Sequence, residues 1–95
     1  MPDWSRYGFH WNEAIVEHIV DGHGVYPEEV EEVFANRPHV VRKGDLYHAY
    51  GRTENGSYLT VICAIGAGTI RVVTARPMDR SERRLYGRHR KNEDP

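Results

Sequence analysis

The sequence has very little cysteine. Cys63 is the only one among 95 residues, so no disulfide can form within the chain. It lies in the apolar segment TVICAI, where we expect a buried and unreactive thiol. A lone reduced cysteine is typical of proteins of the cytoplasm, and we expect that location.

Other features are missing as well. No apolar run approaches the ~20 residues of a membrane-spanning helix, and the N-terminus lacks the basic and apolar segments of a secretory signal. The six histidines are scattered and no CxxC pair exists, so we predict neither a metal site nor a cofactor. The ordinary composition predicts one soluble domain, 1–95, with its core at about 9–86 and a flexible tail at 87–95.

The charges are segregated along the chain although the net charge is only −1. Residues 1–70 contain 5 Lys or Arg and 10 Asp or Glu, whereas residues 71–91 contain 8 basic and 2 acidic residues. This asymmetry indicates either a polyanion or an oppositely charged protein as the partner of the C-terminal part. A solvated helix face is the alternative explanation.

The N-terminal third predicts two helices, and residues 9–11 before them could form a short edge strand. Asn12 is a suitable N-cap for a helix to about Asp21, which Gly22 and Gly24 would end. Pro27 fits the first turn of a second helix, which extends to about residue 36.

Four strands follow, separated by turn signals. They are expected at 39–43, 46–53, 58–65 and 70–76, with Asn55-Gly56 as the strongest hairpin signal. Three consecutive tight turns imply an antiparallel four-stranded meander. With a C-terminal helix after it, the fold class is α+β.

The segment 70–86 joins the last strand to this basic helix. Pro77 cannot donate to a strand ladder and should end the strand, which places Arg76 at the strand end. Asp79 precedes Glu82 by three residues, the spacing of a capping box at a helix start. A side chain at a strand end is held by a rigid element, which suits a functional role.

The turns also predict a site. A two-residue turn at Asn55-Gly56 would place Thr53 opposite Tyr58, and a turn centred on Ala67 would place Tyr58 beside Arg76. Within a register error of one or two residues, the side chains of Arg52, Tyr58 and Arg76 then gather at one end of the sheet. The C-terminal helix starts at that end and could add Arg80 or Arg83.

Such a site suits RNA. Guanidinium groups bind phosphate through paired donors, and an aromatic ring can stack on a base. Cleavage requires the ribose 2′-hydroxyl to attack phosphorus, charge stabilisation on the phosphate, and proton transfers. The spacing does not decide among His23, His48, Glu82 and Tyr86 as proton-transfer groups. Each also has a structural explanation, for example Glu82 as a capping residue.

The ordered motifs resemble the BrnT family of type II toxin–antitoxin toxins. They cover about residues 9–86 and comprise Trp11, His23-Gly24-Val25, PEEVEEVF at 27–34, Gly51-Arg52-Thr53, Gly56, Thr74-Ala75-Arg76, Glu82-Arg83-Arg84 and Tyr86. The resemblance implies a RelE-like fold and a growth-arresting endoribonuclease. It carries site roles onto His23, Arg52, Arg76, Glu82 and Tyr86. The site predicted from the turns adds RNA contacts from Tyr58 and from Arg80 and Arg83 of the C-terminal helix.

The resemblance also implies partners. The antitoxin, BrnA, has a ribbon-helix-helix DNA-binding part, and the complex typically represses its own operon, so operator DNA is expected only for the complex. This chain has Ile15 and Gly22 where the family commonly has lysines, and Ile19 at a common asparagine. These departures favour an alternative, a catalytically inactive binding module of the same fold that engages an acidic partner protein.

Overall fold

The computed structural model describes residues 3–93. Its elements, in chain order, are a short 3-10 helix η1 (Trp4–Arg6), β1 (Gly8–His10), α1 (Glu13–His23), α2 (Pro27–Ala35), β2 (His39–Lys43), β3 (Leu46–Arg52), β4 (Tyr58–Gly66), β5 (Thr69–Pro77) and α3 (Arg80–Glu93). The predicted α+β class is confirmed.

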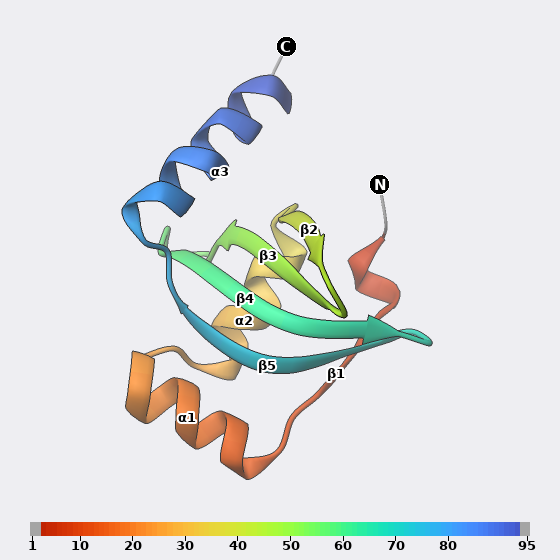
Figure 1. Ribbon diagram of the computed structural model, residues 1–95. Coiled ribbons are helices and arrows are strands. Elements are labelled where there is room, and N and C mark those ends of the chain that lie inside the picture. Colours follow the sequence, from red (N-terminus) through yellow and green to blue (C-terminus); the bar gives the residue numbers. More distant parts are fainter. Residues whose placement is uncertain (1–2, 94–95) are drawn as a thin grey trace.

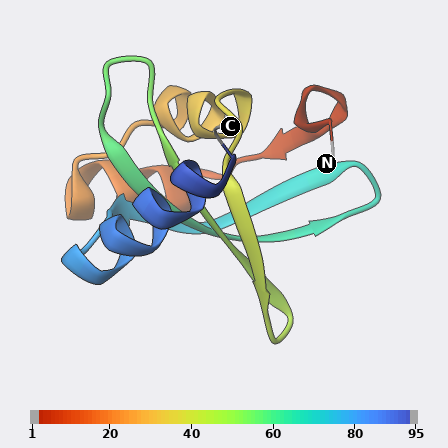
Figure 2. The ribbon, with the colours of Figure 1, turned by 90° about the horizontal axis from the view of Figure 1, so that it is seen from above.

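One sheet in the order β1-β5-β4-β3-β2 divides the molecule into layers. Helices α1 and α2 lie on one side of it, and α3 crosses the other side, as Figures 1 and 2 show. The main core lies between the sheet and α1 and α2, and includes Ile19, Val33 and Val61, all fully buried. On the α3 side, a smaller cluster of Tyr50, Met78 and Tyr86 joins the helix to the sheet. Only part of this second face is covered by α3.

The sheet differs from the prediction by one strand. Residues 3–93 contain five strands, because β1 pairs with β5 in parallel and makes the sheet mixed. The segment before residue 9 also belongs to the folded core, since Trp4 and Tyr7 pack against the main cluster and Trp4 meets Phe34 edge-on at 5.2 Å between ring centroids. A three-residue strand carries too short a pattern to reveal its partner or direction.

The predicted helix starts are confirmed. Asn12 caps α1 by accepting from the Ile15 N–H (2.9 Å), and Pro27 is the first residue of α2. Gly24, with φ of 67°, ends α1, whereas Gly22 lies within the helix. Helix α3 continues to Glu93 and so includes most of the segment predicted as a tail; residues 94 and 95 lie outside the described residues.

The β3–β4 register differs by one residue from the prediction. Gly56 N donates to Thr53 O (3.0 Å), so Glu54 and Asn55 are the central residues of the turn, and Gly56 follows with φ of 90°. Arg52 therefore lies opposite Tyr58, and both side chains share a face of the sheet. The predicted two-residue turn was wrong, because glycine in the left-handed region also follows ordinary turns in longer hairpin loops.

The β4–β5 register differs by two residues. Arg76 lies opposite Thr60, not Tyr58. The turn has two residues, Ala67 and Gly68, both with positive φ, and a bulge between Ile62 and Cys63 adds a further shift. A bulge leaves one residue of a strand unpaired, and nothing in the sequence around position 62 signals it.

Gly51 is required by close packing between the sheet and α2. A Cβ at this position would lie 2.8 Å from Val33 Cγ1 and 3.6 Å from Pro38 Cβ, and Val33 is fully buried. We expect Gly51→Ala to lower the free energy of unfolding by about 1–3 kcal/mol, because an overpacked core must shift. Urea denaturation measures the change.

The matched control for this prediction is Gly87→Ala. Gly87 is exposed in α3, and an added Cβ would meet nothing within 4 Å. Alanine there should raise the free energy of unfolding by up to ~1 kcal/mol through helix propensity. Equal effects at the two positions would contradict the packing explanation for Gly51.

Candidate functional site

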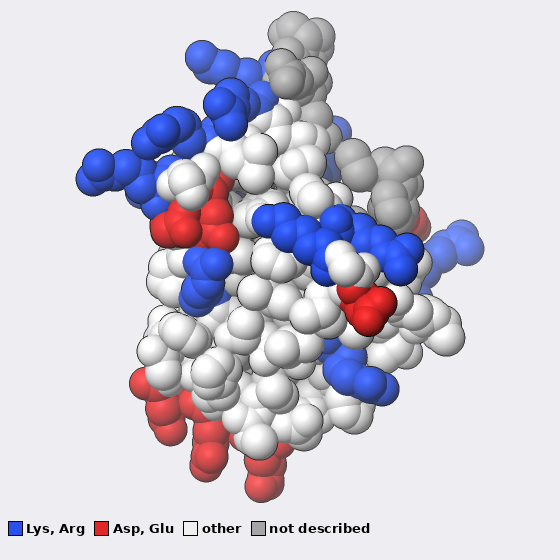
Figure 3. Space-filling view, viewed as in Figure 1, with Lys and Arg blue, Asp and Glu red and all other residues white. Residues whose placement is uncertain are grey.

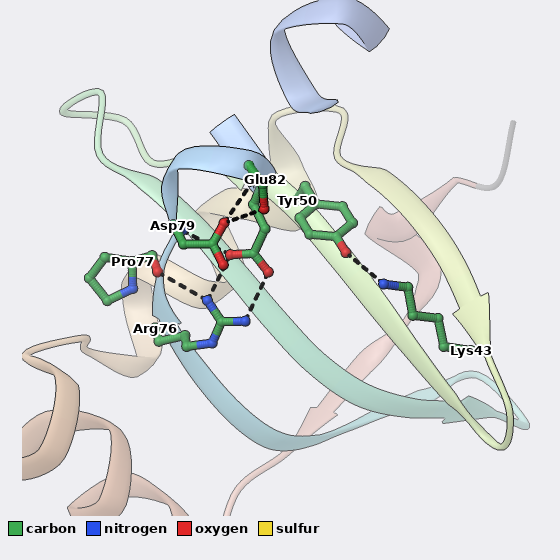
Figure 4. A network of polar contacts seen from close by, with 7 residues as sticks. Lys43, Tyr50, Arg76, Pro77, Asp79 and Glu82 are labelled. Atoms are coloured by element: carbon green, nitrogen blue, oxygen red, sulfur yellow. Dashed lines mark hydrogen bonds and ion pairs between the residues drawn. The ribbon is translucent and has the colours of Figure 1, made fainter. Parts of the chain in front are cut away.

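The end of β5 and the start of α3 are joined by one ion pair. Arg76 Nη1 and Nη2 donate to Glu82 Oε1 and Oε2 at 2.7 and 2.8 Å, a bidentate geometry (Figure 4). The predicted capping box is present too: Glu82 N donates to Asp79 Oδ1 (2.8 Å), and Asp79 N donates to Glu82 Oε1 (2.9 Å). The same carboxylate therefore caps the helix and orients the guanidinium.

This pairing leaves part of Arg76 available. Of the five guanidinium N–H donors, two meet Glu82 and a third, on Nη1, meets Pro77 O at 3.4 Å. The Nε–H and the second Nη2–H, which together form the side edge of the group, have no partner among the described residues. The Arg76 side chain is 32% exposed. An anion can therefore bind this edge in a second bidentate contact while Glu82 holds the other edge.

The pKa of Glu82 reflects this environment. Burial raises the pKa of the carboxyl, but hydrogen bonds from the Arg76 guanidinium and from the Asp79 backbone outweigh burial and bring the pKa below its usual value. The hydrogen bond to Glu82 raises the pKa of Arg76. Both groups are therefore ionised at neutral pH, and Glu82 is poorly suited to donate a proton.

These shifts make acid stability depend on Glu82. Because its pKa is lower in the folded state, its contribution is complete above the unfolded value of 4.5 and is lost as the pH falls through the folded pKa. We expect Glu82→Gln to be less stable than wild type at pH 7 and to lose less stability between about pH 5 and pH 3. Urea denaturation across this range measures both.

Glu17→Gln is the matched control, because Glu17 is exposed in the middle of α1. Its acid profile should follow that of the wild type. If Glu82→Gln loses as much stability in acid as the wild type does, protonation of Glu82 is not what lowers the stability of the folded protein in acid.

A second cationic group surrounds Tyr58. The guanidinium carbons of Arg52 and Arg83 lie 4.7 and 4.2 Å from the centroid of its ring, and Tyr86 meets the ring edge-on at 6.1 Å. Tyr86 is only 3% exposed and packs in the smaller core cluster. The structure thus brings four predicted residues together, although two guanidinium groups already occupy the Tyr58 ring.

Arg52 also borders an open pocket of about 420 Å³. The pocket lies between the end of α2, the β3–β4 loop and α3, and polar side chains line most of it, including Asn36, Thr53 and Arg90. The arginines that line this pocket, Arg37, Arg52 and Arg90, extend the cationic surface beyond Tyr58.

Two predicted residues lie apart from these groups. His23 is the last residue of α1, and its ring meets His18 edge-on at 5.1 Å. His18 Nε2 in turn lies 3.0 Å from Thr74 Oγ1 on β5. Arg80 is exposed at the start of α3. No hydrogen bond, ion pair or ring contact joins His23 or Arg80 to the other predicted residues in the described part of the chain.

Three polar residues that were not selected from the sequence, Tyr50, Thr60 and Thr74, lie on the same sheet face as Arg76. The candidate proton-transfer residue His48 lies on this face too. We call this the open sheet face because α3 covers only part of it, and define it by His48 and Tyr50 of β3, Tyr58, Thr60 and Ile62 of β4, and Thr74 and Arg76 of β5, which share it by register. Tyr50 and Thr60 within it are buried. Lys43 Nζ donates to Tyr50 Oη at 3.5 Å (Figure 4). The signal for β3 was present in the sequence, since His48, Tyr50 and Arg52 alternate and must share one face of a strand.

The charge segregation of the sequence is also spatial. Figure 3 shows basic side chains gathered over α3 and acidic ones over α1 at the opposite end of the molecule. The Arg76–Glu82 pair lies at the edge of the basic region. A polyanion would therefore meet positive charge from α3 beside the open sheet face.

Some motif residues have structural functions. Trp11 Nε1 donates to Glu31 Oε2 (3.0 Å) and joins α2 to the segment before α1. Glu29 of the acidic helix accepts from Tyr26 N (3.0 Å) at its start. These contacts explain the residues without any role in chemistry.

Cys63 is fully buried, and burial raises the pKa of its thiol to about 12. A thiolate nucleophile is therefore excluded at neutral pH. Within residues 3–93, no three His, Cys, Asp or Glu side chains are grouped so that they could hold a metal ion. No described helix combines the length and apolar character needed to cross a membrane.

Together these observations define a small α+β protein with a cationic, aromatic-lined candidate site on one sheet face. No family model and no curated protein matches the chain. Among solved structures, it is similar to the 1.1 Å crystal structure of the Brucella abortus ribonuclease toxin BrnT, with a TM-score of 0.61 and 18% sequence identity. The match covers 78% of this chain and 99% of that one. The chain therefore has the BrnT-like fold that the motifs implied.

Proposed function

We propose that this protein is the toxin of a type II toxin–antitoxin system and acts as a metal-independent endoribonuclease. The observation that supports this best is a BrnT-like fold in which Arg76 offers a free guanidinium edge beside an open sheet face. The reaction class needs no metal because the ribose 2′-hydroxyl of the substrate is the nucleophile and the guanidinium stabilises the phosphate charge.

The residues have distinct roles in this proposal. Arg76 holds the scissile phosphate through its side edge, and Glu82 keeps that edge oriented. Arg52 and Arg83 add positive charge next to the ring of Tyr58. Tyr58 stacks a base once one guanidinium moves to a phosphate, and Arg80 extends the basic surface at the helix start. Proton-transfer roles for His23 and Tyr86 remain predictions from the family resemblance.

The partners follow from the same proposal. The toxin acts in the cytoplasm, and an antitoxin of the BrnA type, with a ribbon-helix-helix part, neutralises it. Operator DNA is bound only by the toxin–antitoxin complex, since a chain with a net charge of −1 is poorly suited to bind duplex DNA alone.

Induction of the chain in a bacterial host, with growth and total RNA followed together, tests this function. Arrest with RNA loss supports the proposal, and purified protein should then cut RNA in the presence of a chelator. Soluble, folded protein without arrest or RNA cleavage would contradict it.

A second candidate is the inactive binding module of the same fold. The bidentate Arg76–Glu82 pair favours it, because an arginine that already has a carboxylate partner can be purely structural. In that case the basic α3 surface would bind an acidic protein, and the folded chain would capture that partner without cutting RNA.

A further inference from the structure

His48 occupies a position on the open sheet face that suits proton transfer. It lies in β3, opposite Ile62 of β4, and Ile62 lies opposite Thr74 of β5. Arg76 is two residues further along β5, so it shares the face with His48 and lies two strands away. Neighbouring strands are ~4.8 Å apart, so two strand spacings separate the backbones of the two residues across the sheet.

The two ring nitrogens of His48 have different surroundings. Nδ1 is buried and has no hydrogen-bond partner in the described part of the chain, whereas Nε2 is not enclosed in this way. Protonating the ring would leave a charged N–H at Nδ1 without an acceptor, which is costly in a buried position. The neutral ring is therefore favoured over the charged one, and because Nε2 is the nitrogen that a substrate can reach, the tautomer with its proton on Nδ1 is the form that can act as a base there.

On balance, the charged groups around the ring also favour its neutral form. These charged groups are Lys43 of β2, Arg76 of β5 and Glu82 of α3. The neighbours on β3 and β4 are the Tyr50 ring, 6.3 Å away between ring centroids, and the apolar Ile62. Burial and the positive charges of Lys43 and Arg76 lower the pKa of His48, and Glu82 opposes them only in part. A neutral imidazole at pH 7 is the form that accepts a proton.

We propose that His48 is the general base of the RNA cleavage, taking the proton of the ribose 2′-hydroxyl through Nε2 while Arg76 holds the adjacent phosphate. This inference rests on the proposed endoribonuclease function. The 2′-oxygen then forms a bond to phosphorus, and the bond between phosphorus and the 5′-oxygen breaks with its electron pair on that oxygen. The 5′-oxygen takes a proton from water, and His48 later returns its proton to solvent. The products are a 2′,3′-cyclic phosphate and a free 5′-hydroxyl.

Other histidines of the described chain suit this role less well. The ring of His39 stacks on that of His89 at 3.8 Å between centroids, which covers one face of each ring. His18 and His23 pack against each other on α1, at the far edge of β5. His48 is in the electrostatic surroundings of both Arg76 and Glu82.

The test compares RNA cleavage rates of wild type, His48→Gln and the control His10→Gln between about pH 5 and pH 8. His10 is exposed on β1 and outside the site, so its variant should match the wild type. We expect His48→Gln to cut about 10²–10⁴-fold more slowly and to lose the fall in rate toward acid pH that protonation of the base causes. Circular dichroism and thermal melts establish that each variant is folded.

His48→Ala with added imidazole provides a second readout that a structural role would not produce. Recovery of cleavage with rising imidazole concentration supports the general-base assignment. If folded His48→Gln keeps the wild-type rate and acid limb, or folded His48→Ala is inactive without rescue, the assignment is overturned while the endoribonuclease function stands. If the wild type itself does not cut RNA, the proposed function fails first.

Discussion

Arg76→Ala is expected to abolish RNA cleavage and toxicity while the protein stays folded. Removing one donor to developing charge typically lowers the rate about 10²–10³-fold, and Arg76 offers two donors on its free edge. The fold should survive because Glu82 keeps its hydrogen bond from Asp79 N and continues to cap α3. Induction in a bacterial host, with growth and total RNA followed together, measures the loss beside the wild type.

The stability cost of this variant can be separated from its effect on activity. Glu82 is only 13% exposed, so Arg76→Ala leaves a carboxylate without its main partner and should cost about 1–3 kcal/mol. The double variant Arg76→Ala/Glu82→Gln removes that unpaired charge. It should recover part of the stability and none of the activity.

Arg76→Lys completes the series. Lysine retains the charge but cannot bind Glu82 and phosphate through two planar edges at once. We expect a folded protein with strongly reduced cleavage. Unfolding of Arg76→Ala that the double variant fails to relieve would show that Arg76 is structural, and wild-type cleavage by a folded Arg76→Ala would remove it from the site.

Ile19→Asn is expected to destabilise the protein by about 4 kcal/mol. Ile19 is the fully buried residue of α1 and packs in the main core, although the resembled family commonly has asparagine there. The substitution loses buried apolar surface and places an amide where no partner is available. For a domain whose total stability is about 5–15 kcal/mol, this loss is large. Urea denaturation at neutral pH measures it.

Ile15→Lys is the matched control one turn earlier on the same helix. Ile15 is only half-buried, so a lysine can extend its stem along the core and keep its ammonium group in solvent. We expect a loss of about 1 kcal/mol or less. The resembled family commonly has lysine here, so faster RNA cleavage by Ile15→Lys than by the wild type would show that isoleucine at this position lowers the activity. Equal destabilisation by the two substitutions would contradict the core role of Ile19.

The local elements were determined by the sequence. The strand at 39–43 and the starts of α1 and α2 agree with the prediction, and so does the capping box that joins Asp79 to Glu82. Each of these features depends on contacts between residues a few positions apart. Caps, prolines and alternating patterns therefore suffice to predict them.

The site depends on contacts that only the tertiary structure decides. The turn between β3 and β4 centres on Glu54-Asn55, not on Asn55-Gly56 as predicted. This shift places Arg52 opposite Tyr58, with both side chains on the same face of the sheet. The strand-end signal correctly selected Arg76, but its bidentate pairing with Glu82 and its free edge follow from how α3 leaves the sheet.

The parallel pairing of β1 and the position of His48 relative to Arg76 are also tertiary features. A one-residue change of register turns a side chain to the other face of a sheet, and a bulge shifts everything beyond it. The sequence by itself therefore determined which elements form and which residue types they present. Which of those residues meet was decided by strand register and by the placement of α3, because these depend on packing across the whole molecule.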